Sequence, residues 1–254
     1  LVPFVNRLGP YINTFKIRSW SKMDLSPFFR FLDPLPQLEE ILVRIPFNQS
    51  LLDPPAFTDF IIASSATLKD VALRLTPTGL ALDPTQEQPV LDWMQSTLSD
   101  TRCFANVVEL DLCPTNLPGG VGILQLAIER TPHLKVFKLR DRYLTPEDTI
   151  LVVKALSTRE ELISLRLNVY TLTVQVIDAM AKSLPQLKYL WLSLGDRRPN
   201  TDNSDSDFLV SCAHPSDRWV LANCVPIGCL VSRYPDAYIQ GLETVGYLYL
   251  AGRV

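Results

Sequence analysis

The sequence predicts an α/β protein made of repeated strand-and-helix units, with parallel strands on a concave face and helices on a convex face. An apolar anchor residue recurs about every 25 to 30 residues over much of the chain, and apolar residues follow it three and five positions later. Helix-start signals stand between successive copies. Because such a unit buries its apolar side chains only against its neighbours, we expect one elongated solenoid domain over residues 1–254.

The repeat is clearest where a proline precedes the anchor by two residues. Leu35-Pro36-Gln37-Leu38 returns unchanged as Leu184-Pro185-Gln186-Leu187. We expect about eight to nine irregular repeats in all. A strand is predicted to start near each of the anchors Ile12, Leu38, Leu68, Val107, Leu134, Leu162, Leu187 and Val245.

Helix starts are predicted from capping residues followed by proline or an apolar face. Thr145 precedes Pro146 and two acidic residues, which suits the first turn of a helix, and Thr173 is a plausible cap for a helix over 174–183. The same signals predict that helices begin at Ser26-Pro27 and at Asp53-Pro54.

Two stretches interrupt the periodic pattern. Residues 75–89 contain Pro-rich turn sequences and predict a loop insertion, and residues 196–207 are polar and acidic and predict a surface loop. No strand is assigned between Leu192 and Val245, because the template match there is poor.

Composition narrows the class of protein. Of the 254 residues 47% are hydrophobic, and the net charge of -3 gives no basic field, so nucleic acid is not expected as the main partner. The sequence has neither an apolar run long enough to span a membrane nor a signal-peptide pattern. Its 5 cysteines are scattered and odd in number, which favours reduced thiols and a cytoplasmic or nuclear protein.

Signals for catalysis are weak, and we expect neither an enzyme nor a bound cofactor or metal. The only histidines are His133, in a turn, and His214. Cys212, His214, Cys224 and Cys229 form a conceivable zinc set, but their spacing fits known zinc sites badly. The glycines after Pro118 lack the Gly-Lys-Ser/Thr of a phosphate-binding loop and predict a structural turn.

The repeat resembles that of the leucine-rich-repeat family, whose unit reads L-x-x-L-x-L-x-x-N/C-x-L. Here the Asn/Cys slot holds Thr115, Arg142 and Tyr170, so the family's asparagine ladder is missing. Irregular repeats, Leu-Pro-x-Leu turns and acidic inserts are similar to the repeat region of fungal F-box/leucine-rich-repeat proteins.

That resemblance implies a substrate-recognition region of an adaptor in a Skp1-cullin ubiquitin ligase. The F-box that would dock on a Skp1-type adaptor is expected upstream of Leu1 if it exists. The segment 35–42 superficially resembles an F-box opening, but Pro46 and Pro54-Pro55 break the helices that an F-box needs. The alternative is a ribonuclease-inhibitor-like or other leucine-rich-repeat scaffold with no link to ubiquitin.

The predicted binding surface is the strand face that points away from the core. If the residues three and five after each anchor are buried, those two, four and six after it point outward. These outward positions hold Lys16, Arg18, Arg44, Arg74, Lys138, Arg140 and Arg166, and toward the C-terminal end of the face the aromatic residues Tyr189, Trp191, Tyr247 and Tyr249. We expect a protein partner with acidic or phosphorylated residues beside an apolar anchor.

Two alternatives stay open for this surface. In the first, the arginines serve only to shield strand edges or to pair with acids on the same face, namely Glu40, Asp70, Glu109 and Asp111. In the second, the aromatic residues lie under the polar loop rather than in solvent.

Overall fold

The computed structural model describes residues 1–19, 23–75, 84–112, 119–194 and 244–250. The chain divides into two compact units, Leu1–Leu134 and Lys135–Val254. Both units are α/β structures with parallel strands, in agreement with the predicted class. The polar loop expected at 196–207 and the cysteines and histidine of the conceivable zinc set lie outside the described residues.

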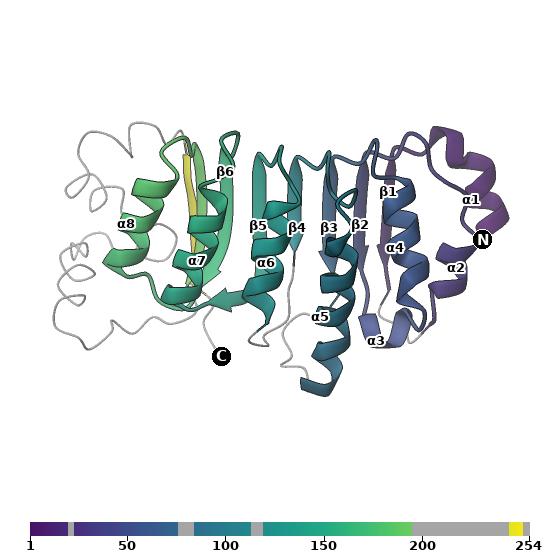
Figure 1. Cartoon of the computed structure of the whole chain (residues 1–254), viewed down its shortest axis with the longest axis horizontal. Helices are drawn as coiled ribbons and strands as arrows, with labels where there is room; N and C mark the ends of the chain where they lie inside the picture. Colours follow the sequence, from purple (N-terminus) through teal and green to yellow (C-terminus); the bar gives the residue numbers. More distant parts are fainter. Residues whose placement is uncertain (20–22, 76–83, 113–118, 195–243, 251–254) are drawn as a thin grey trace. The chain divides into compact units, whose positions relative to one another are not determined.

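The first unit holds four strands that pair in sequence order, all parallel. Its elements are α1 (Val2–Leu8), η1 (Gly9–Tyr11), β1 (Thr14–Arg18), α2 (Ser26–Arg30), β2 (Glu40–Arg44), α3 (Phe47–Ser50), α4 (Pro54–Ala63), β3 (Asp70–Arg74), α5 (Pro84–Ser99), β4 (Glu109–Leu112) and α6 (Gly120–Glu129). Figure 1 shows α4, α5 and α6 on one face of these strands.

The second unit repeats the arrangement with longer strands. It contains β5 (Val136–Leu144), α7 (Pro146–Leu156), β6 (Ser164–Val169), α8 (Val174–Ser183), β7 (Tyr189–Leu194) and β8 (Thr244–Leu250). Successive strands again pair in parallel, and α7 and α8 lie on one side of them (Figure 1).

The anchor residues predict where the strands begin. Seven of the eight strands start two residues after their anchor, as β2 does after Leu38 and β6 does after Leu162. The last strand is the exception, since it begins at Thr244, one residue before the expected anchor Val245. There the register places Val245 opposite Leu190 instead of Leu187, so the predicted offset in the last repeat is wrong by three residues.

The ladder between β7 and β8 also contains an irregularity, between Trp191 and Ser193.

The predicted helix starts in the second unit are confirmed. The Thr145 hydroxyl accepts a hydrogen bond from the backbone N–H of Asp148, and the Thr173 hydroxyl accepts one from that of Val176. These two bonds satisfy amide groups that have no partner within the helix.

Helices in the first unit begin where the sequence predicts them, but the hydrogen bonds at their starts differ from the expected caps. Asp53 precedes α4 without capping it, because its carboxylate pairs with Arg30. The Asp53 N–H donates to the Ser26 hydroxyl at 2.8 Å, which ties the start of α4 to the start of α2. The insertion expected at 75–89 is helical from Pro84 onward, with Pro89 inside α5.

Aromatic rings fill much of the core of the first unit. Phe57 contacts Phe29 at a centroid distance of 4.6 Å and stacks on Trp93 at 5.5 Å. The Trp93 indole N–H donates to the Thr58 hydroxyl at 2.8 Å, so the one polar group of this ring is satisfied. The rings join α2, α4 and α5 into one packed layer beneath the strands' apolar face.

Candidate protein-binding face

The face of the strands that points away from the core is the one that the sequence predicts. In β2 and β3 the burial alternates residue by residue, with Ile41 and Val43 buried and Glu40, Leu42 and Arg44 half-buried. The apolar positions three and five after the anchor therefore face the core, and the even positions face outward.

A row of arginines crosses the first unit at one level. Arg18 stands opposite Arg44, and Arg44 stands opposite Arg74, because β1, β2 and β3 pair in the same register. Lys16 lies two residues before Arg18 on the same face and is exposed. The predicted alignment of these basic residues is confirmed.

Acids on the same face neutralise part of this row. The Lys16 Nζ atom lies 2.7 Å from Glu40 Oε1, and Arg74 Nη2 lies 3.1 Å from Asp111 Oδ2. Asp111 is only 3% exposed and the Arg74 side chain 15% exposed, so this second pair is buried. For Arg74 the structure shows the alternative of pairing with an acid on the same face, because Asp111, opposite Ala72 on the next strand, lies within diagonal reach of it.

The second unit brings two cations and an indole into line. Lys138 stands opposite Arg166, and Arg166 stands opposite Trp191, on three neighbouring strands. All three side chains are half-buried. The Tyr189 ring stacks on the Trp191 ring, with centroids 6.0 Å apart and planes 19° apart. We name Lys138, Arg166, Tyr189 and Trp191 the cation–indole row.

Three of the predicted basic and aromatic residues, Arg140, Tyr247 and Tyr249, are placed differently from the expectation. The register between β5 and β6 shifts after Lys138 and resumes with Tyr143 opposite Asn168, so Arg140 lies at an irregularity of the ladder. In β8, Thr244 stands opposite Tyr189 and Gly246 stands opposite Trp191. Tyr247 and Tyr249 therefore do not align with Tyr189 and Trp191 as expected, and Tyr249 stands opposite Ser193.

The irregularity in β5 also creates a contact that the sequence pattern misses. Tyr143 and Tyr170 pack with ring centroids 5.5 Å apart, and Tyr170 is 51% exposed. The two tyrosines follow their anchors by different numbers of residues, so only the register shift brings them together. The sequence signal for this contact was the presence of a tyrosine near the end of each of two successive strands.

Arg142, which occupies the family's asparagine slot, is a structural residue. Its guanidinium is buried and lies 3.6 Å from the Asp148 carboxylate in the first turn of α7. Because Asp148 also donates its N–H to Thr145, the pair fixes the end of β5 to the start of the following helix.

No metal-binding cluster is found in the part of the chain that the structure describes. It contains no group of three or more His, Cys, Asp or Glu side chains placed to hold a metal ion. His133 is exposed in its turn, as expected. The described helices include none with the length and apolar character needed to cross a membrane.

Cys103 is a free, buried cysteine. Burial raises the pKa of its thiol to about 12, and the negative charge of Asp100 adds to the shift. We expect iodoacetamide to leave Cys103 unmodified in the native protein at about pH 8 and to alkylate it after denaturation, since the thiolate is the reacting form. Peptide mapping by mass spectrometry measures this, and rapid native alkylation of Cys103 would contradict it.

Comparisons with known proteins add no family assignment. No model of a known protein family matches the chain, and no curated protein matches it. What is shown is an α/β protein whose described strands run parallel within each unit and carry an outward face of cationic and aromatic side chains.

Proposed function

We propose that this chain is a non-catalytic protein-binding module of the leucine-rich-repeat type, a solenoid with strands on its concave face. The regular two-residue offset between anchor and strand, and the sequence-ordered parallel pairing in each unit, support the repeat architecture. The cation–indole row carries the functional part of the proposal.

The cation–indole row combines the features of a binding hot spot. Trp191 and Tyr189 offer stacked, half-buried rings, which supply contact area at little entropic cost. Arg166 and Lys138 stand at the same level on the two preceding strands, where a guanidinium can bind a carboxylate or phosphate through two bonds. The fitting partner is a protein segment with acidic or phosphorylated residues next to an apolar anchor.

The role proposed for the module is substrate recognition within a Skp1-cullin ubiquitin ligase, through an F-box outside this chain. The segment 35–42 is not an F-box opening, since Glu40 already belongs to strand β2. Affinity purification of the full-length gene product tests the role. Recovery of Skp1 and a cullin supports it, whereas recovery of a tightly bound partner without them supports a ribonuclease-inhibitor-like scaffold.

Trp191→Ala should accelerate dissociation of the partner captured by the wild-type chain. Truncating an aromatic anchor of this kind costs about 2 kcal/mol of binding free energy, or about 30-fold in affinity. Surface plasmon resonance with the purified partner measures the dissociation rate. Tyr11→Ala, which removes an exposed ring in the first unit, is the control and should leave the rate unchanged.

The double variant Lys138→Glu/Arg166→Glu should instead slow association and weaken its dependence on salt. Long-range attraction between charges near the surface is screened over about 8 to 10 Å at physiological ionic strength, and it governs encounter more than dissociation. Unchanged rates for this variant and for Trp191→Ala across a salt titration would place recognition outside the cation–indole row.

A further inference from the structure

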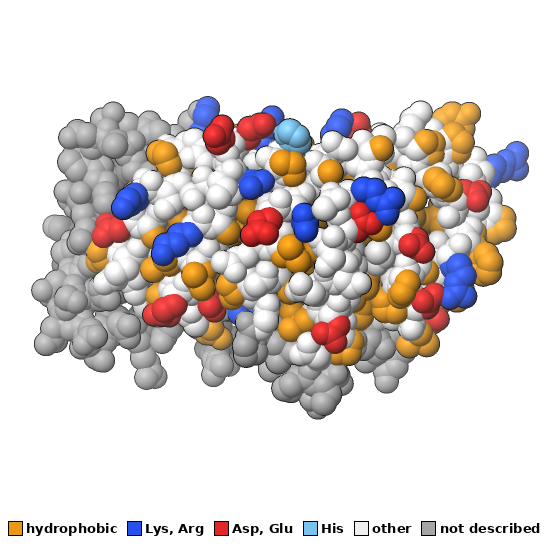
Figure 2. Space-filling view, in the orientation of Figure 1, with side chains coloured by type: hydrophobic (Ala, Val, Ile, Leu, Met, Phe, Trp, Pro, Cys, Tyr) orange, Lys and Arg blue, Asp and Glu red, His pale blue; other side chains and the backbone are white. Residues whose placement is uncertain are grey.

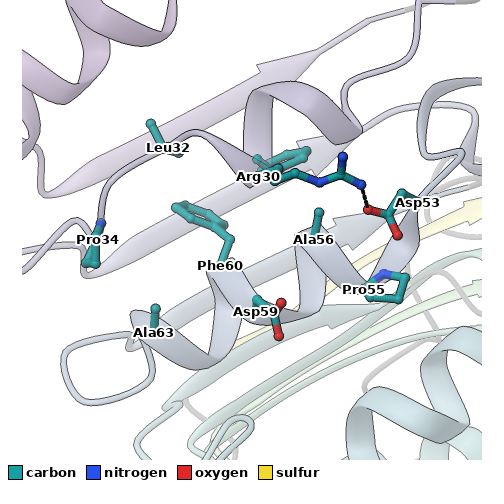
Figure 3. A pocket seen from close by; sticks show the side chains of 10 residues that line it. Arg30, Leu32, Pro34, Asp53, Pro55, Ala56, Asp59, Phe60 and Ala63 are labelled. Atoms are coloured by element: carbon teal, nitrogen blue, oxygen red, sulfur yellow. Dashed lines mark hydrogen bonds and ion pairs between the residues drawn. The ribbon is translucent and has the colours of Figure 1, made fainter.

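A cavity of about 260 Å³ lies between α2 and α4, on the helix side of the first unit (Figure 3). The two helices are joined at one end by the bond from the Asp53 N–H to Ser26 and by the ion pair of Arg30 with Asp53. The cavity is smaller than the roughly 300 to 1,000 Å³ of sites that hold drug-sized ligands. Its size suits a single side chain rather than a cofactor.

Buried, mainly apolar residues form part of the cavity wall, and charged residues form much of the rest. Phe29, Leu32, Ala56 and Phe60 line it, and all four are buried residues. Figure 3 shows the Ala56 methyl and the Phe60 ring pointing from α4 toward Leu32 and Arg30. An apolar group that enters is removed from water and gains contacts with these walls, whereas a polar group would lose hydrogen bonds there.

The charged residues that line the cavity favour a cationic neighbour for that apolar group. Arg30 and Asp53 neutralise each other. Asp59 lies on the α4 side of the rim, is exposed, and makes no ion pair with any residue that the structure describes. The lining therefore carries a net negative charge, and a guanidinium can reach its carboxylate through two parallel hydrogen bonds.

Exposed apolar side chains continue the surface beyond the cavity. Phe31, next to the lining residue Leu32, is 65% exposed. Asn6 fixes α1 beside this segment by donating to the Phe31 carbonyl and accepting from the Asp33 N–H, each at 3.0 Å, and Phe4 of the same helix is also exposed. Figure 2 shows hydrophobic side chains interspersed with charged ones over α1, α2 and α4.

We propose that this cavity is a second binding site, on the helix face, for a peptide segment of a partner protein that inserts one aromatic or long aliphatic side chain and places an adjacent arginine on Asp59. The site is independent of the cation–indole row, since it lies in the other unit and selects the opposite charge. One chain can thus bind an acidic segment on its strands and a basic, apolar segment on its helices.

Nuclear magnetic resonance titration of the ¹⁵N-labelled full chain tests the proposal with blocked dipeptides at millimolar concentration. Acetyl-phenylalanyl-arginine amide should shift backbone signals of residues 29–34 and 53–63. Acetyl-alanyl-arginine amide and acetyl-phenylalanyl-glutamate amide should bind about 2- to 5-fold or more weakly, because each lacks one of the two features.

Three variants complete the experiment. Ala56→Leu fills the cavity and should weaken binding at least about tenfold. Asp59→Asn removes the rim charge without changing its shape and should weaken binding of the arginine peptide about 2- to 5-fold, while leaving the glutamate peptide no weaker. Glu129→Gln removes an exposed helix charge elsewhere in the unit and should change nothing. Asp59 is exposed, so the Asn variant folds even if Ala56→Leu does not.

Several results would overturn the proposal. These are an absence of localised shifts, equal affinity for the three peptides, or binding unaffected by Ala56→Leu or by Asp59→Asn. A dimer of the wild-type chain in sedimentation velocity that Ala56→Leu dissociates would assign the cavity to a second copy of the chain and likewise refute the peptide site.

Discussion

Replacing Leu165 with alanine is expected to lower the free energy of unfolding by about 2 to 5 kcal/mol. Leu165 is fully buried at the centre of the second unit, where it stands between Phe137 and Leu190 on the neighbouring strands. Removing its side chain leaves a cavity among residues held by the strand ladder, so the surroundings can relax only in part. Denaturant titration followed by circular dichroism measures the loss.

The adjacent residue provides the control for this substitution. Arg166 points to the opposite face of β6 and is half-buried, so Arg166→Ala should cost much less than Leu165→Ala. Equal losses for the two variants would mean that β6 turns the other face to the core.

Arg74→Ala is expected to destabilise the first unit by about 3 to 5 kcal/mol. The substitution leaves the Asp111 carboxylate, 3% exposed, without the guanidinium that lies 3.1 Å from it. A buried carboxylate that loses the guanidinium of an ion pair keeps its desolvation penalty, which is why breaking such a pair costs more than losing a surface pair. The change is measured as the shift in the denaturant midpoint.

Arg18→Ala is the matched control, because Arg18 belongs to the same row of arginines and is exposed. It should change stability by no more than about 0.5 kcal/mol. In an Asp111→Asn background, Arg74→Ala should cost distinctly less than alone, since the two effects are coupled. Equal costs for Arg18→Ala and Arg74→Ala would show that the Arg74–Asp111 pair contributes nothing.

Most of the strand starts, the helix caps in the second unit and the alignment of the arginines depend on local sequence, and they were predicted correctly. Apolar spacing around anchors such as Leu38 and Leu134 determines where strands begin, because alternation and burial are properties of a few consecutive residues. The capping residues Thr145 and Thr173 act on amides only three residues away. Arg18, Arg44 and Arg74 align because their repeats share one template.

Features that depend on a neighbouring strand could not be predicted in the same way. The burial of Asp111 results from its diagonal position relative to Arg74, and the contact of Tyr143 with Tyr170 results from a shift of register in β5. Tyr249 stands opposite Ser193 for a similar reason. Each outcome depends on irregular pairing or on packing between repeats, which no single repeat encodes.

The order in which the strands pair also bears on how the chain folds. From β1 to β4, and from β5 to β7, each strand pairs with the one that follows it in sequence, so these pairings close only short stretches of chain, whereas β8 pairs with β7 across residues 195–243. Folding can then begin at any of the short-range pairs and spread to the next, and only β8 requires a distant segment to arrive. For the same reason, local damage to one strand leaves the pairs on either side with most of their own contacts.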